Sequence, residues 1–192
     1  GNGSEIVVDN AGDLTVTSVG TGQDAALFAN SGGKITINAK DGKTLKLRTE
    51  ATDKNNGAVV KTMNGAAGVR SSITLNGQVD IEADGVKSNE GLSAVASDIR
   101  VAGGAIKATG GAQYAIRAYG EYASTNEGRV YVNTTEDTAG NATGAANNKT
   151  VLVGNVSTSG SMNSKGVINI GLNTADSSWT GDYAENNDGT VN

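Results

Sequence analysis

The sequence feature that most limits the fold is a two-residue alternation of apolar and polar side chains in short runs. In residues 34–39, for example, Ile35 and Ile37 alternate with polar side chains. Because neighbouring side chains of a strand point to opposite faces, each run buries one face and exposes the other. The inward positions predicted from the other runs are Leu14 and Val16, Leu45 and Leu47, Ile73 and Leu75, Val79, Ile81 and Ala83, Ile99 and Val101, Ile106 and Ala108, Val130 and Val132, Val151 and Val153, and Ile168, Ile170 and Leu172. No apolar stripe recurs at helical spacing over three turns, so the chain is predicted to be all-β.

The core of this all-β protein is predicted to be narrow, because the 192 residues include only one Phe and one Trp. Four apolar anchors, Leu27, Val59, Leu92 and Ile116, recur at intervals typical of solenoid proteins. The 28 glycines, together with asparagines between the runs, allow the positive φ angles of sharp corners. These features favour a parallel β-solenoid of about six to eight coils, stacked about 4.8 Å apart.

An antiparallel β-sandwich is the alternative fold. It requires two-residue turns between neighbouring strands, for which Asn64-Gly65 and Asn76-Gly77 are candidates. A sandwich of this size would need larger side chains between its two sheets, and this favours the solenoid.

The composition excludes several classes of function. Without Cys or His, the chain has no thiolate nucleophile, no Ser-His-Asp triad and neither thiolate nor imidazole as a metal ligand. A net charge of −5 argues against nucleic acid and anionic membranes as partners. No apolar run approaches the roughly 20 residues of a membrane-spanning helix, so this section is not expected to insert into a membrane.

Two segments carry a resemblance to a known family. Residues 166–192 read GVINIGLNTADSSWTGDYAENNDGTVN, and residues 103–121 read GGAIKATGGAQYAIRAYGE. Both resemble passenger domains of Gram-negative type V autotransporters, in particular large surface adhesins of that family. The pattern is carried by Gly166, Asn169, Leu172, Ser178, Trp179, Thr180, Gly181, Gly189, Thr190 and Val191.

The resemblance implies a right-handed parallel β-helix that is exported through an outer-membrane β-barrel. It also implies roles in adhesion to host cells or other bacteria, in self-aggregation and in biofilm formation. The Gly-Asp-Ser-Gly nucleophile motif of the protease passengers has no counterpart here. We therefore expect residues 1–192 to form a single solenoid section of a longer passenger, on the bacterial cell surface or secreted.

Four of the five tyrosines fall between residues 114 and 131 and suggest a contact surface. The alternation points Tyr114, Ile116 and Ala118 inward and two Arg-x-Tyr pairs outward. Outward Arg and Tyr are typical of recognition hot spots, because they offer a large contact area at a low entropy cost. The predicted ligand contacts are Arg117, Tyr119, Tyr122, Arg129 and Tyr131.

Two charged clusters are further candidates for binding or chemistry. Lys43, Lys46 and Arg48 form a basic patch that would suit an acidic glycan or surface. Asp80, Glu82 and Asp84 share the outward face of one strand, at a spacing within the range of glycosidase carboxylate pairs. Either cluster is also compatible with a solvated face that keeps the strands soluble.

Residues 135–150 contain no apolar side chain larger than Ala and are predicted to form a protruding loop, where solenoids often vary and bind. Trp179 is expected to cover an apolar coil edge rather than to bind a ligand.

Together these features predict a non-enzymatic adhesin segment without cofactor or metal. Its expected partners are glycans or proteins on a host or bacterial surface, with self-association between cells as a possibility. Two other hypotheses stay open. One is a structural spacer or self-associating stalk module, and the other is a carbohydrate-active β-helix enzyme that uses the acidic stripe.

Overall fold

The fold is a parallel β-solenoid in a computed structural model that describes residues 3–19, 25–49, 57–63, 69–85, 89–120, 126–139, 141–160, 164–185 and 189–192. In these residues the regular structure consists of strands, and all of the strand pairs except one are parallel. No helix that could span a membrane occurs in the described residues. The predicted solenoid is therefore confirmed, and the sandwich is not.

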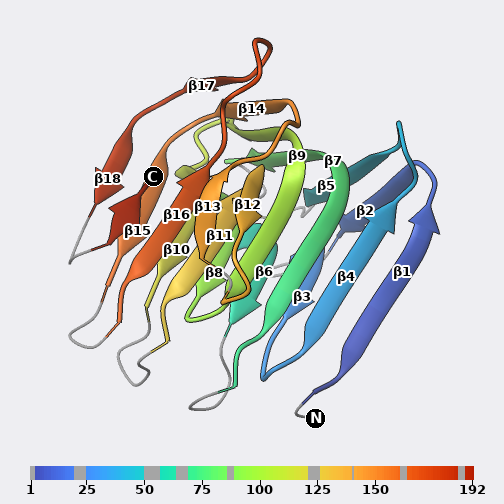
Figure 1. The fold of residues 1–192 in the computed structure, drawn as a ribbon, viewed down its shortest axis with the longest axis horizontal. Helices are drawn as coiled ribbons and strands as arrows, with labels where there is room; N and C mark the ends of the chain where they lie inside the picture. Colours follow the sequence, from blue (N-terminus) through green and yellow to red (C-terminus); the bar gives the residue numbers. More distant parts are fainter. Residues whose placement is uncertain are drawn as a thin grey trace.

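The strands form three faces around a narrow core (Figure 1). Face 1 contains β1 (Glu5–Ala11), β4 (Lys34–Ala39), the first parts of β7 (Ser72–Asp84) and β9 (Asp98–Thr109), β11 (Gly128–Val132), β16 (Gly166–Ile170) and β19 (Thr190–Val191). Face 2 contains β2 (Leu14–Ser18), β5 (Thr44–Thr49), the second parts of β7 and β9, β14 (Thr150–Val153) and β17 (Ser178–Thr180). Face 3 contains β3 (Leu27–Ala29), β6 (Ala58–Met63), β8 (Glu90–Val95), β10 (Tyr114–Tyr119), β15 (Val156–Ser159) and β18 (Tyr183–Glu185).

One strand from each face makes a coil, so the three faces hold six coils, and β19 begins a seventh. In Figure 1 the chain runs upward along face 1, passes over to the distant side and advances from β1 towards β19, which is a right-handed path. Coil lengths vary: Lys34 pairs with Ser72, whereas Val167 pairs with Thr190 only 23 residues later.

The core is a stack of like residues. On face 1, Ile35 pairs with Ile73 and Ile73 with Ile99, and all three are at most 9 % exposed. On face 2, Leu45 pairs with Val79 in the same way. Each side chain packs on its counterpart about one strand spacing away, so small aliphatic residues fill the interior without large aromatics.

The anchor spacing of face 3 is largely as predicted. Leu92 pairs with Ile116, as their alignment in the sequence indicated. Leu27, however, pairs with Val60 rather than with Val59, so the predicted register of β6 was wrong by one residue. Val59 is also fully buried. Because Val59 and Val60 are both buried, the sequence pattern could not show which of them aligns with Leu27.

On faces 1 and 2, three predicted inward positions were wrong. Val151 and Val153 point outward, because Leu152 between them takes the core position and stacks on Ile106. Leu172 lies beyond the end of β16 and is 37 % exposed.

Asn76-Gly77 is also not a hairpin turn. It lies within β7, at the corner where the strand passes from face 1 to face 2 and its register with β9 shifts. Gly77 has a φ of 151°, and a Cβ there would lie 2.5 Å from the Cβ of Ala39. The glycine therefore permits a bend inside a continuous strand.

Residues 135–150 belong largely to an excursion between β11 and β14. β12 (Thr134–Glu136) and β13 (Ala142–Ala145) pair as an antiparallel hairpin. The hairpin lies across the outer side of face 1, in front of β9 and β11 (Figure 1). It therefore adds a wall to an otherwise flat sheet.

Candidate functional site

The predicted arginine and tyrosine residues form a compact surface on face 3. We use the name arginine–tyrosine surface for Tyr114, Arg117 and Tyr119 of β10. The guanidinium carbon of Arg117 lies 4.7 Å from the ring centroid of Tyr119 and 5.5 Å from that of Tyr114. These are distances of cation–π contact. Tyr114 therefore lies on the outside, and the prediction that it points inward was wrong: Ala115 is buried beside Ile116 at the start of β10.

Arg117 is held in place by an acidic neighbour from the preceding coil. Its Nη1 donates a hydrogen bond of 2.8 Å to a carboxylate oxygen of Glu90. Burial by itself lowers the pKa of Arg117, but the hydrogen bond and charge of Glu90, with the two tyrosines, raise that pKa above its ordinary value. The guanidinium is thus permanently charged and oriented, and its buried Nε has no hydrogen-bond partner among the described residues.

Arg129 and Tyr131 do not join this surface, because β11 belongs to face 1. Arg129 donates a hydrogen bond of 3.0 Å from Nε to Glu127. Tyr131 points outward but is only 3 % exposed, with the Arg100 guanidinium 4.9 Å from its ring centroid. Burial raises the pKa of Tyr131, an effect that the nearby arginines partly oppose. Its ring is therefore not available for stacking on a ligand.

Tyr122, the fifth predicted contact, lies outside the described residues.

The predicted basic patch and acidic stripe lie on adjacent strands and partly neutralise each other. Lys46 is in register with Asp80, and Arg48 with Glu82. Arg48 Nη2 lies 2.6 Å from Asp80 and 3.6 Å from Glu82. Both carboxylates of the predicted glycosidase pair therefore lie within ion-pair distance of one arginine.

Lys43, the third basic residue, pairs across coils with Asp13 at 2.8 Å. The hydrogen bond from the Lys43 ammonium, and then that from the Thr44 N–H, lower the pKa of Asp13. The three basic residues therefore form no unpaired cationic cluster. In the described part of the chain, no group of three or more acidic residues could hold a metal ion.

Trp179 covers the core as predicted. It packs on the interior beside Leu152, and its Nε1 donates a hydrogen bond of 3.2 Å to the carbonyl of Gly154.

A polar groove that no sequence pattern indicated lies where the hairpin meets face 1. One pocket, of about 230 Å³, lies between β7, β9 and the hairpin, and an adjoining pocket of about 400 Å³ extends to the loop 40–43. Asn76, Ala102 and Asn148 line both pockets, so the two form one groove. We call this the amide groove. A row of Asn at strand ends is a weak signal in sequence, because Asn is also common in turns.

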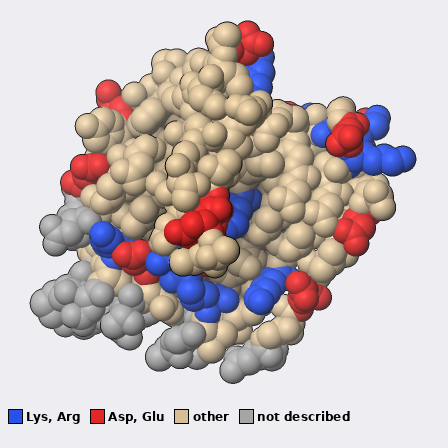
Figure 2. Space-filling model, viewed as in Figure 1, with Lys and Arg blue, Asp and Glu red and all other residues tan. Residues whose placement is uncertain are grey.

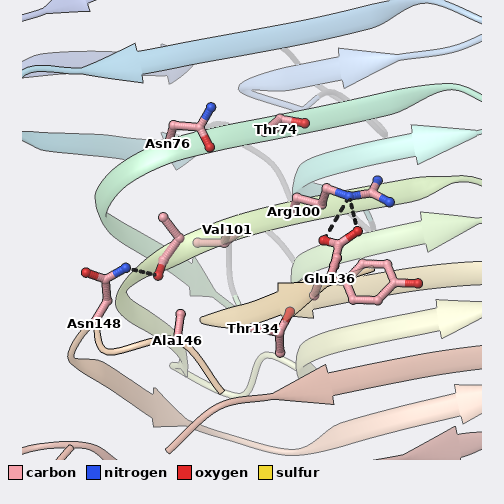
Figure 3. A pocket seen from close by; sticks show the side chains of 10 residues that line it. Thr74, Asn76, Arg100, Val101, Thr134, Glu136, Ala146 and Asn148 are labelled. Carbon is pink, nitrogen blue, oxygen red and sulfur yellow. Dashed lines mark hydrogen bonds and ion pairs between the residues drawn. The ribbon is translucent and has the colours of Figure 1, made fainter. Parts of the chain in front are cut away.

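The hairpin wall of the amide groove is fastened by one ion pair. Arg100 Nε donates to both carboxylate oxygens of Glu136, at 3.0 and 2.9 Å, as Figure 3 shows. Thr134 lines the same pocket, and its buried hydroxyl has no hydrogen-bond partner in the structure. Figure 2 shows some charges on this side of the molecule beside opposite charges and others standing alone, with broad uncharged surface between them.

No protein-family model matches the chain, and neither a curated protein nor a solved structure matches it.

Proposed function

We propose that this chain is a non-enzymatic adhesive section of a bacterial surface solenoid. It binds glycans or proteins on a host or neighbouring bacterial cell through outward side chains that the coils hold rigid. The proposal includes export as part of an autotransporter passenger and display on the cell surface or in secreted form. For this location the support is the resemblance of residues 166–192 and 103–121, together with a fold of the kind that the resemblance implies.

The observation that carries the adhesive role is the arginine–tyrosine surface. The Arg117 guanidinium contacts the rings of Tyr114 and Tyr119 and forms an ion pair with Glu90. A partner that binds this surface therefore does not have to order these side chains. Preorganised Arg and Tyr are the residue types that dominate recognition hot spots. Each contact is modest, and many copies on one cell supply avidity.

A non-enzymatic role is supported by the state of the carboxylates. Asp80 and Glu82, which would have to act as acid and base, are both engaged by Arg48. Catalysis on this stripe would require the pair to separate first.

The test is a binding panel of host glycans, matrix proteins and bacterial cells, with retention and released product read from the same wells. We expect saturable retention without product. Arg117→Ala and Tyr119→Ala should each weaken retention at least tenfold. Arg129→Ala is the matched control, because that arginine is also paired with a glutamate but lies on face 1.

Three results would overturn the proposal. Equal losses in Arg117→Ala and Arg129→Ala would show that the arginine–tyrosine surface is not the contact. Released product that is lost in Asp80→Asn would show an enzyme. Concentration-dependent sedimentation with no retention on any surface would show a self-associating spacer.

A further inference from the structure

We infer that the amide groove is a second binding site, and that it takes a neutral, linear oligosaccharide. This inference goes beyond the proposed adhesive role, since the groove lies on face 1 and the arginine–tyrosine surface on face 3. Either site can exist without the other.

The groove has the size of a ligand site. Its two pockets, of about 230 and 400 Å³, share Asn76, Ala102 and Asn148, and the larger lies within the usual range of ligand sites. It extends from the loop 40–43 of the second coil to the hairpin of the fifth, roughly 15 Å along the solenoid at the spacing of parallel strands. A chain of a few sugar rings matches this length.

The amides of the groove are fixed in orientation. Asn76 donates its Nδ2–H to Asn38 at 2.7 Å, and Asn148 donates its Nδ2–H to the carbonyl of Ala102 at 2.9 Å. Among the described residues no hydrogen bond reaches the Oδ1 of either asparagine. Both side chains are exposed, so two oriented carbonyl oxygens remain to accept hydrogen bonds from a ligand.

Other polar groups complete the lining. Gln78 lines the larger pocket, and its side chain has no hydrogen bond among the described residues. Thr74 and Thr134 line the smaller pocket, and the hydroxyl oxygen of Thr134 is itself buried. Adjacent sugar hydroxyls donate and accept hydrogen bonds at close spacing, and a wall of amide and hydroxyl groups suits them.

Charge favours a neutral ligand. Both carboxylate oxygens of Glu136 engage Arg100, and Lys43 is paired with Asp13. At the outer end of the groove, the lining includes one lysine and one aspartate, Lys40 and Asp41, whose formal charges cancel. A sulfated or carboxylated ligand would have to compete with Glu136 for the guanidinium, whereas a neutral one leaves every pair intact.

The floor of the groove argues against a peptide. It is made of outward side chains of β7 and β9, whose backbone groups are already paired within the parallel sheet. An extended peptide gains its affinity by pairing with an open sheet edge, and the described parts of β7 and β9, which form the floor, are paired on both sides.

The test uses calorimetric titration with neutral hexasaccharides of β-1,4-linked glucose, mannose and N-acetylglucosamine. Hexagalacturonate and a chondroitin sulfate hexasaccharide serve as acidic probes. We expect at least one neutral probe to bind, with little dependence on salt. Ala102→Phe fills the groove from its floor and should weaken that binding at least tenfold. Ala105→Phe is the matched control, since Ala105 lies on the same strand but on face 2, opposite Asp80.

A second variant covers the case in which Ala102→Phe disturbs the fold. Gln78→Ala removes a side chain without a hydrogen bond and should weaken binding three- to tenfold in a protein of unchanged stability. Binding of acidic probes only, or no neutral binding at 5 mM, would overturn the inference. So would neutral binding that is lost in Arg117→Ala but kept in Ala102→Phe. Loss of adhesion in Arg117→Ala tests the proposed function separately.

Discussion

Arg48 of β5 donates two hydrogen bonds of 2.6 Å to Asp80 of β7, one to the carboxylate and one to the main-chain carbonyl. A single guanidinium thus joins the second coil to the third at two points, and its side chain is only 18 % exposed. Hydrogen bonds in which the donor or the acceptor is charged are stronger than those between neutral groups. The Arg48–Asp80 pair therefore links the second coil to the third.

Removal of the link between Arg48 and Asp80 should destabilise the solenoid. In Arg48→Ala, Asp80 loses both hydrogen bonds from the guanidinium and Glu82 loses its ion pair. We expect the free energy of unfolding to fall by about 1–2 kcal/mol. Denaturant unfolding followed by circular dichroism measures the change. Lys46→Ala, which alters an exposed neighbour on the same strand, should stay within about 0.5 kcal/mol. Equal effects of the two variants on the free energy of unfolding would show that Arg48 does not stabilise the contact between the coils.

Asn133 should be the most sensitive polar residue of the hairpin base. It is fully buried with a φ of 53°. Its Nδ2 donates to the carbonyls of Asn148 and Gly171, and its Oδ1 accepts the Asn148 N–H. Asn133→Ala leaves these groups unpaired in a left-handed conformation that Ala adopts poorly, so we expect a loss of about 3 kcal/mol. Calorimetric unfolding tests this, with exposed Asn173→Ala as a control that should change little.

The carboxyl of Asp13 should titrate below its ordinary pKa of 3.8, because Lys43 and the Thr44 N–H hydrogen-bond the charged form. A lowered pKa means that the pair stabilises the fold above the ordinary pKa and that this contribution disappears as the pH falls through the lowered value. Carboxyl-carbon NMR titration gives the midpoint directly. In Lys43→Ala the midpoint should rise towards 3.8, whereas Lys46→Ala should not move it.

The Arg100–Glu136 pair should hold the hairpin against face 1. In Glu136→Ala we expect faster hydrogen exchange across residues 134–145, measured by mass spectrometry, because the other side chains of the hairpin are small. The pKa of Tyr131, which burial raises, should also fall towards its ordinary value of 10.0 as the hairpin lifts. Glu5→Ala, an exposed change on β1, is the control for both measurements. Unchanged exchange and an unchanged tyrosine titration would show that the hairpin is held by its base alone.

The inward positions were largely predictable because alternation is a local property. Ile73 and Leu75, for example, point inward for reasons contained in five consecutive residues, and both are fully buried. The prediction failed where this local signal was ambiguous. In β14 three consecutive residues are aliphatic, and only the stack of Leu152 on Ile106 selects the middle one. At the start of β10, Tyr114 was predicted to point into the core. Its ring lies on the outside instead, where it makes a cation–π contact with Arg117.

The outward surfaces were far less predictable. Arg117 and Tyr119 were singled out correctly as neighbours on one strand, but Arg129 and Tyr131 were grouped with them although they lie on another face. The basic patch and the acidic stripe were treated as separate surfaces, and Arg48 joins them. The amide groove went unnoticed because its shared residues, Asn76, Ala102 and Asn148, come from three separate parts of the chain.

The sequence by itself determined that the chain forms strands, which side of most strands faces the core and that the core is narrow. These properties depend on side-chain period and size, which act over a few residues. The tertiary structure alone decided which outward side chains meet. In a parallel solenoid a residue touches its counterpart one coil away, and coil length here depends on loops and on a hairpin whose lengths follow no period. Asp80 therefore meets Arg48, and Glu136 meets Arg100, through stacking that no local pattern encodes.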